Sequence, residues 1–302
     1  MPTLEENLSY WEQDCDWSQR GEEWSVAWGG SESQWWGTIL PRIHAFVPCA
    51  SILEIAPGYG RWTHFLKELG QKLAVVDLSD RCIEHCRHRF ANSSHISYWA
   101  NDGRSLAMIP DQSVDFAFSF DSLVHAEADV LEAYVGELAR ILTPQGVGFL
   151  HHSNAAPYAW YFTLFQSKRW AGGSKEAGEP EPSQSERSML RRALSRVKHG
   201  LIKARIIAND HSRGMSMSAD HFQRFCDQSG LRCIGQELTN GDGRMLIDCF
   251  STFTRPGSVW DRPYRRVENH SFPEEIRRLS AISDLYRKVE KVRPPGMLTA
   301  SK

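Results

Sequence analysis

The chain has 302 residues, and its 35 Lys and Arg against 37 Asp and Glu give a formal net charge of −2. A near balance of charge excludes a basic protein that coats nucleic acid. No apolar run approaches the roughly 18 residues of a membrane span, and the acidic N-terminus is unlike a signal peptide. The seven cysteines are scattered and odd in number, which is typical of reduced thiols rather than of a disulfide framework. We therefore expect a soluble, cytoplasmic protein.

The first 48 residues differ in composition from the rest of the chain. Residues 1–40 carry eight acidic residues against one basic residue, Arg20, and hold six of the eleven tryptophans. Such a segment is too aromatic for a disordered acidic tail. We expect an N-terminal cap over residues 1–48, made of short helices and turns that pack aromatic side chains on the main domain or roof its ligand site.

Residues 49–255 are expected to form the main domain. Apolar runs bounded by turn residues predict strands at 51–56, 72–76, 95–99, 114–119 and 147–151, and helical periodicity predicts helices at 61–69, 79–90, 126–142 and 218–228. Strands that alternate with helices at this spacing are typical of an α/β fold with a doubly wound, mostly parallel, Rossmann-like sheet. Ligands of such sheets bind at the carboxyl ends of the strands.

The alternation of strands and helices lapses over residues 155–217, which we expect to be a helical lid insertion. An amphipathic helix is predicted there at 185–205, and residues 187–205 include seven Lys or Arg and no acidic residue. The basic face is either a solvated helix surface or a contact for an anionic acceptor or an anionic membrane surface. The acidic cap argues against nucleic acid as a partner.

The sheet is expected to close with a hairpin. Strands predicted at 231–238 and 245–253 are joined by Asn240-Gly-Asp-Gly243, a strong hairpin signal that brings the sheet to seven strands with an antiparallel end. The extension 256–302 carries an amphipathic helix at 273–292. We expect the apolar face of this helix to be buried, and it is a candidate dimer contact.

A glycine loop, Glu54-Ile-Ala56-Pro-Gly58-Tyr-Gly60, joins the first strand to the first helix. Without side chains at Gly58 and Gly60, a ligand can lie against the backbone and the helix N-terminus. A dinucleotide-binding fold also places Gly-x-Gly here, but its third glycine would fall at Thr63. An acid at Glu54 would repel the phosphates of a dinucleotide and suits a ligand that bears an ammonium group.

Four motifs resemble the class I S-adenosylmethionine-dependent methyltransferases. They are Glu54-x-Ala56-x-Gly58-x-Gly60, Asp77 at the end of the second strand, Asn101-Asp102-Gly103 after the third, and Phe118-Ser119-Phe120-Asp121 at the fourth. The resemblance covers residues 51–154 and 218–255, and it departs from the family at Ala56, where a glycine is usual. It implies methyl transfer with S-adenosylmethionine as the cofactor.

The resemblance also implies which residues bind the cofactor. The glycine loop and the acid before it would approach the methionine portion and its ammonium group. The acid that ends the second strand would bind the ribose hydroxyls, the acid after the third strand would take the adenine amino group, and the turn after the fourth strand would border the methionine end. In chain order, these residues are Glu54, Ala56, Gly58, Gly60, Asp77, Asp102, Gly103 and Ser119.

Methyl transfer needs a base where the acceptor is a hydroxyl, and histidine is the natural base at neutral pH. The crevice offers His125 after the fourth strand and the His151-His152 pair after the fifth. We take His125, His152 and Asp121 as candidate catalytic residues. The structural alternatives are a helix cap for His125 and a sheet-facing side chain for one of the pair. Asp121, His125, Glu127 and His152 could also hold a divalent metal, but their spacing matches no ligand motif, so no metal is predicted.

The acceptor is expected in a pocket between the Trp-rich cap and the lid insertion. Aromatic walls favour a sugar or another ring, and the stretch from Trp35 to Glu54 is similar to methyltransferases of bacterial polysaccharide biosynthesis. The sequence therefore predicts O-methylation of a sugar or glycan hydroxyl. The alternatives are an N- or O-methyltransferase of a small aromatic metabolite and a non-catalytic protein that binds S-adenosylmethionine.

Overall fold

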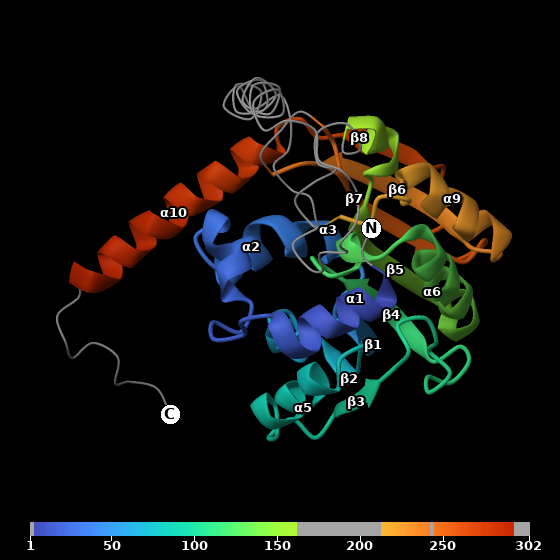
Figure 1. Cartoon of the computed structure of the whole chain (residues 1–302), viewed down its shortest axis with the longest axis horizontal. Coiled ribbons are helices and arrows are strands. Elements are labelled where there is room, and N and C mark those ends of the chain that lie inside the picture. Colours follow the sequence, from blue (N-terminus) through green and yellow to red (C-terminus); the bar gives the residue numbers. More distant parts are fainter. Residues whose placement is uncertain (1–2, 162–212, 242–244, 293–302) are drawn as a thin grey trace, which may run out of the picture.

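The computed structural model describes residues 3–161, 213–241 and 245–292. Its centre is an eight-stranded sheet with the strand order β3-β2-β1-β4-β5-β7-β6-β8 (Figure 1). The strands are β1 (Cys49–Ile55), β2 (Gly70–Asp77), β3 (Ile96–Ala100), β4 (Val114–Ser119), β5 (Leu142–Ser153), β6 (Arg232–Thr239), β7 (Asp248–Thr254) and β8 (Arg265–Glu268). Strands β1 to β5 are parallel, and β7 is antiparallel to β5 and β6. The α/β class, the mostly parallel sheet and its antiparallel end are confirmed.

The sheet has one strand more than the seven that the sequence predicts. Strand β8 pairs in parallel with the outer edge of β6, from Gly235 beside Arg265 to Leu238 beside Glu268. All four residues of β8, Arg-Arg-Val-Glu, are exposed. The strand therefore lacks the apolar alternation that reveals a half-buried strand. The extension 256–302 is thus not purely helical, and its charged strand suits an exposed sheet edge.

Helices cover both faces of the sheet, as a doubly wound fold requires. They are α4 (Thr63–Leu66), α5 (Asp80–Arg89), α6 (Ala128–Ile141) and α9 (Ala219–Gln228). Leu53 and Ile55 of β1 share a core with α6 and α9, whereas Ile52 shares a core with α4 and α5. Because side chains alternate along a strand, Glu54 lies on the same face as Ile52, toward α4.

Residues 3–43 form a chain of six short helical elements. They are α1 (Leu4–Ser9), η1 (Tyr10–Asp14), η2 (Glu22–Trp28), α2 (Ser31–Gln34), η3 (Trp35–Ile39) and α3 (Leu40–Ile43). The first two bury no residue. In contrast, Trp35 is 2% exposed and stacks on Phe65, with 4.8 Å between the ring centroids. The second half of this segment is therefore part of the core, and the first half lies over the carboxyl end of the sheet (Figure 1).

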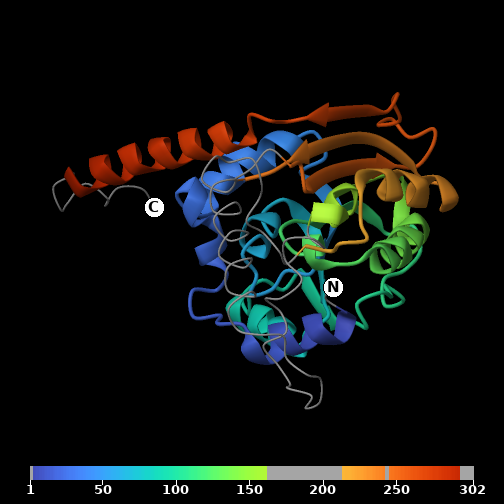
Figure 2. The same ribbon diagram turned by 45° about the horizontal axis from the view of Figure 1, so that its top comes forward.

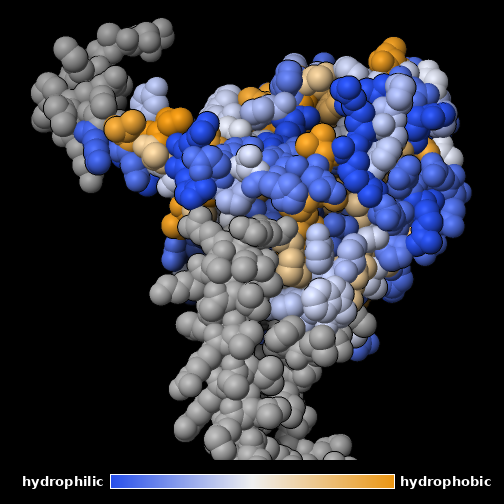
Figure 3. Space-filling view, turned by 90° about the horizontal axis from the view of Figure 1, so that it is seen from above, coloured by the Kyte–Doolittle hydropathy of each residue, from blue (hydrophilic) through white to orange (hydrophobic). Residues whose placement is uncertain are grey.

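The C-terminal helix α10 (Phe272–Val292) projects from the body of the protein (Figure 2). Phe272 and Ile276 in its first turns are buried. Farther along, Leu285 is 62% exposed and Tyr286 is 70% exposed, and Figure 3 shows apolar side chains on the projecting part. Leu279 is half-buried against Gly37, so the expectation that the apolar face is buried is wrong from Ile282 onward, as far as the side chains are described.

Most of the expected lid lies outside the described residues, because the predicted helix at 185–205 falls within 162–212. Across the described ranges, no helix combines the length and the apolar composition that crossing a membrane requires.

Candidate active site

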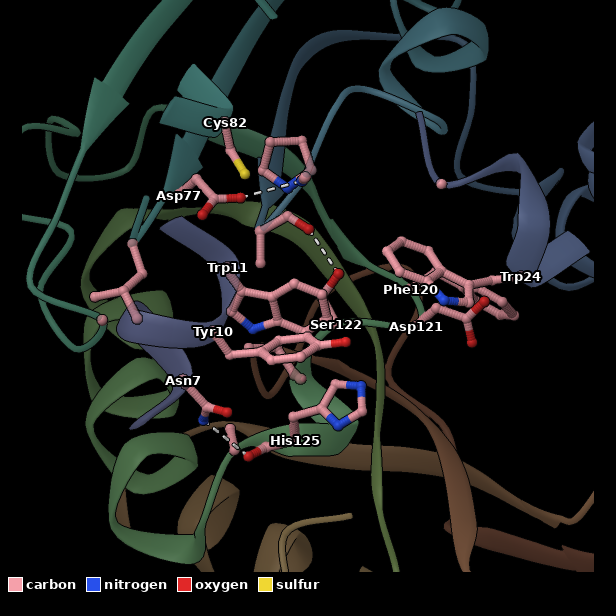
Figure 4. Close-up of a pocket in the computed structure, with 18 of the residues that line it drawn as sticks. Asn7, Tyr10, Trp11, Trp24, Asp77, Cys82, Phe120, Asp121, Ser122 and His125 are labelled. Carbon is pink, nitrogen blue, oxygen red and sulfur yellow. Dashed lines mark hydrogen bonds between the residues drawn. The ribbon is translucent and has the colours of Figure 1, made fainter. Parts of the chain in front are cut away.

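A cavity of about 1210 Å³ opens at the carboxyl ends of β1, β2 and β4 (Figure 4). Its floor consists of the loops that follow these strands, and its roof consists of residues between Leu4 and Trp28. Pockets for one small ligand commonly measure about 300–1,000 Å³. This cavity therefore has room for two ligands side by side.

The loop after β1 turns sharply beneath the cavity. Ala56, Gly58 and Gly60 have positive φ angles of 57°, 56° and 80°. Ala56 and Gly58 line the cavity, and a Cβ at Gly58 would lie 2.7 Å from the ring of Trp17 in the roof. Gly60 lies outside the lining, contrary to expectation, and a Cβ there would lie 2.6 Å from the ring of Phe90. Core packing rather than ligand approach therefore requires the glycine at 60.

Asp77 ends β2 and borders the cavity, with 7% of the residue exposed. Its carboxylate accepts hydrogen bonds from the backbone N–H of Gly58 at 3.1 Å and of Ser79 at 2.9 Å. Burial raises the pKa of Asp77 to about 6, although these two hydrogen bonds act in the opposite direction. A carboxylate oxygen has more than one acceptor site, so Asp77 can still bind hydroxyl groups of a ligand.

Glu54 lies behind the glycine loop rather than at the cavity surface. Its side chain accepts a hydrogen bond from the Thr63 hydroxyl at 2.5 Å, and the residue is 1% exposed. Burial raises the pKa of Glu54 to about 8, so the group is mostly protonated at neutral pH. The geometry places Glu54 where it can orient the loop, not where it would touch a ligand.

The residues expected near the adenine and the methionine ends are also only partly at the cavity. The Asp102 carboxylate caps its own turn, because it accepts from the N–H of Arg104 at 2.9 Å and of Ser105 at 2.7 Å. Asp102 borders a separate cavity of about 460 Å³, whereas Gly103 lines the main one. Ser119 is fully buried, and its hydroxyl has no partner among the described protein atoms. Of these three predicted residues, Gly103 is the one at the cavity.

His125 and Asp121 also line the cavity, and in Figure 4 each lies apart from Asp77, His125 beside Trp11 and Asp121 beside Phe120. The His125 ring stands beside Trp11, with 5.7 Å between the ring centroids. Its backbone carbonyl accepts from the side chain of Asn7 at 3.1 Å, which ties this residue to the roof. Asp121 forms an ion pair with Arg61, with 2.9 Å between Oδ2 and Nη2.

His152 faces away from the cavity, which corrects its place among the candidate catalytic residues. Its ring stacks on Phe222 of α9 with 4.6 Å between the centroids, and its two nitrogens lie 2.8 Å from the Ser251 hydroxyl and the Ser153 carbonyl oxygen. Burial lowers the pKa of His152 to about 3, so the ring stays neutral. Since side chains alternate along β5, His151 points to the opposite face, toward Asp121.

Aromatic rings wall much of the cavity. They belong to Tyr10, Trp11, Trp17, Trp24, Trp28, Tyr59, Trp62, Phe120 and Tyr134. The Arg61 guanidinium lies 4.4 Å from the ring centroid of Trp62 and 5.4 Å from that of Trp24. A buried arginine that contacts two indole rings and one carboxylate holds this wall rigidly.

Sequence reasoning missed Arg61 and Ser122. The Ser122 hydroxyl donates to the carbonyl oxygen of Ala56 at 2.7 Å and joins two floor loops. Arg61 directly follows the glycine loop, and a charge at such a buried position signals a nearby carboxylate.

Among the described residues, no three His, Cys, Asp or Glu side chains could hold a metal ion. Glu127, considered as a ligand above, instead accepts from the N–H of Ser216 at 2.7 Å.

Comparison with known proteins shows which family the domain around this cavity matches. Residues 52–146 match the family model of a methyltransferase domain. The protein is an S-adenosylmethionine-dependent methyltransferase. The matched segment contains the glycine loop, Asp77, Asp121 and His125.

Many solved structures are similar to this methyltransferase, and two of them serve as examples. The first is the PH0226 protein from Pyrococcus horikoshii OT3, with 15% identity over 82% of this chain and 95% of that chain and a TM-score of 0.49. The second is DhpI in a complex with SAM and HEP, with 18% identity over 84% of this chain and 98% of that chain and a TM-score of 0.49. No curated protein matches the chain.

The cavity of this methyltransferase fits its cofactor. The Asp77 carboxylate offers acceptors for the hydroxyl groups of a nucleoside, and Ala56 and Gly58 line the cavity beside it.

Proposed function

We propose that the methyltransferase methylates a hydroxyl of a small, ring-shaped acceptor such as a sugar unit, with His125 as the general base. The observation that carries this proposal is the place of His125: among the described residues that line the cavity, it is the one histidine. A hydroxyl must lose its proton as the methyl group arrives, and an imidazole is suited to take that proton at neutral pH.

The cofactor would occupy the end of the cavity that contains Asp77. Asp77 would accept hydrogen bonds from the ribose hydroxyls, and the backbone of Ala56 and Gly58 would border the methionine portion, with Gly103 at the adenine end. S-Adenosylmethionine supplies a methyl group on a positively charged sulfur. The contribution of the protein is therefore mainly to hold the acceptor oxygen in line with that methyl group.

The acceptor would occupy the aromatic end. Indole rings offer a flat surface on which the apolar face of a sugar or an aromatic ring can stack. Asp121 would accept a hydrogen bond from a second polar group of the acceptor and so fix its orientation, because its carboxylate lines the cavity. The roof from Leu4 to Trp28 covers this end and favours a small acceptor over the interior of a polymer.

The division into a cap at 1–48, a methyltransferase domain at 49–255 and an extension at 256–302 belongs to the same proposal. The first half of the cap would complete the acceptor site. Both described ends of the insertion 155–217 support its role as a lid, because Ala159 and Arg213 line the cavity.

A small aromatic metabolite is the second candidate acceptor, favoured by the nine Trp, Tyr and Phe side chains of the described lining. A phenol would need the same base as a sugar hydroxyl. An amine would not, because a neutral amine attacks without prior loss of a proton. The two candidates therefore differ in the fraction of the cell that contains the acceptor and in their dependence on His125.

The test is incubation of the protein with methyl-labelled S-adenosylmethionine and fractionated cell extract. We expect label in a polar, sugar-containing fraction, and label in solvent-extractable material would favour the second candidate. His125→Ala should lower turnover by roughly 10²–10⁴, the usual contribution of a general base. His125→Asn is the control, because it keeps a hydrogen bond without the proton affinity and should be equally slow. Full activity in both variants would exclude His125 as the base.

A further inference from the structure

A cluster of ionisable side chains lies behind the acceptor end of the cavity, where β4, β5 and β7 meet. Its members are Arg61, Asp121, His151, Arg213 and Asp248. His151 is at the centre and is 4% exposed. Its ring lies between those of Phe120 and Phe250, at 4.7 Å from each centroid. This histidine is therefore fixed in place and does not itself line the cavity.

The two nitrogens of His151 face different carboxylate residues. The backbone N–H of Asp121 donates to Nδ1 at 3.2 Å. Because Nδ1 accepts this bond, the neutral ring carries its hydrogen on Nε2. Nε2 has no hydrogen-bond partner among the described atoms and lies 3.8 Å from Oδ1 of Asp248. Arg213 holds Asp248 with two bonds, of 2.7 Å and 3.1 Å.

Asp121 needs support because its backbone is strained. Its φ of 65° lies in the left-handed region, which aspartate adopts more readily than most residues but still less readily than glycine, so surrounding contacts are needed to hold it there. Burial alone would raise the pKa of Asp121, but the Arg61 guanidinium, 2.9 Å from Oδ2, outweighs it and holds the pKa well below its usual range. The cavity therefore contains a permanently ionised carboxylate whose direction depends on a strained backbone.

We propose that His151 is a positioning residue that holds Asp121 in this conformation and so directs its carboxylate at the acceptor. The inference rests on the proposed function, in which Asp121 binds the acceptor. Without Nδ1, the N–H of Asp121 is buried with no partner, and relief of that cost favours a backbone change that turns the carboxylate away.

Three variants at position 151 separate the contributions of the two nitrogens. His151→Phe keeps a ring between Phe120 and Phe250 but removes both nitrogens. His151→Asn keeps an acceptor close to the place of Nδ1, and His151→Gln places its amide closer to Nε2. We expect the Asp121 amide to exchange its hydrogen faster in the Phe and Gln variants than in the wild type and the Asn variant, as measured by NMR.

The functional test measures how much acceptor each variant needs for half-maximal labelling. In the Phe and Gln variants, half-maximal labelling should require at least about tenfold more of the extract fraction that the wild type labels, while the Kd for S-adenosylhomocysteine changes less than about twofold. The Asn variant should remain within about threefold of the wild type. Equal losses in all three variants, or an unchanged Asp121 amide in the Phe variant, would overturn the proposal. If the wild type labels no fraction, the proposed function fails, and amide exchange still decides whether His151 holds Asp121.

Discussion

At one end of the cavity, Asp77 accepts a hydrogen bond from Gly58, a residue 19 positions away along the chain. Where we assign the acceptor, the carbonyl of His125 accepts a hydrogen bond from Asn7, a residue 118 positions away. The end that we assign to the donor is made by one strand-loop-helix unit and the strand that follows it. The acceptor end is assembled from segments that meet only in the complete fold. Substitutions that alter the backbone conformation should therefore have the larger effect on stability and binding at the donor end. At the acceptor end, the larger effects should come from substitutions that alter packing between distant segments.

The largest effect is expected at the glycine loop. Gly60→Ala places a Cβ 2.6 Å from the ring of Phe90, at a φ of 80°. Overpacking and the left-handed conformation together should lower the free energy of unfolding by about 2–5 kcal/mol. Urea denaturation measures this loss.

Gly58→Ala is the matched control within the same loop. Its Cβ would meet Trp17 of the roof at 2.7 Å instead of the core. We expect a stability loss of about 2–4 kcal/mol, from the left-handed conformation and from displacement of the Trp17 ring, together with a weaker affinity for S-adenosylhomocysteine. An unchanged affinity for S-adenosylhomocysteine in Gly58→Ala would contradict the division of the loop into a core side and a cavity side.

This division also shows what could be predicted from the sequence. The parallel strands and the glycine loop are visible because apolar runs and glycines are local signals. The charged strand β8 carries no such signal. The choice between His151 and His152 could not be made either, because residues 146–153 of β5 are all buried and no alternation of polar and apolar residues marks its two faces. The partner of Arg61 could not be found, because that contact depends on the fold.

Glu54 is expected to give the next largest effect. Its pKa is about 8 in the fold, well above the ordinary value of 4.5. The folded protein therefore retains a proton that the unfolded chain loses, so stability should fall as the pH rises from about 4.5 to about 8. Glu54→Gln should remove this term, which amounts to about 2–3 kcal/mol between pH 5 and pH 7.

Unfolding curves at several pH values test this expectation. Asp77 contributes a similar decline that ends near pH 6, but it is present in both proteins and cancels in their difference. Parallel stability curves for the wild type and Glu54→Gln would mean that the carboxyl group of Glu54 is ionised within the fold.

Asp77 tests the donor end by binding. Asp77→Ala should weaken S-adenosylhomocysteine binding by about ten- to hundredfold, or roughly 1.5–3 kcal/mol, because it removes hydrogen bonds to a charged group. The pKa of about 6 adds a second expectation, since protonation removes acceptor capacity. Wild-type affinity should fall as the pH drops below about 6, whereas that of Asp77→Asn should not. Calorimetry measures both, and an unchanged Kd in Asp77→Ala would place the ribose elsewhere.

The smallest expected effect is at Ala56, where a glycine is usual in the family that the loop resembles. Its φ of 57° costs an alanine about 1–2 kcal/mol, and a glycine would avoid this cost but would lose about 0.5–1 kcal/mol through the greater freedom of the unfolded chain. Ala56→Gly should therefore stabilise the protein by about 0.5 kcal/mol, a rise in Tm of about 1–2 °C. Donor affinity should change less than about twofold, because the backbone already has the conformation that a glycine adopts readily. If Ala56→Gly instead destabilises the protein, the methyl group of Ala56 contributes packing that outweighs backbone strain, and local backbone geometry does not govern the donor end.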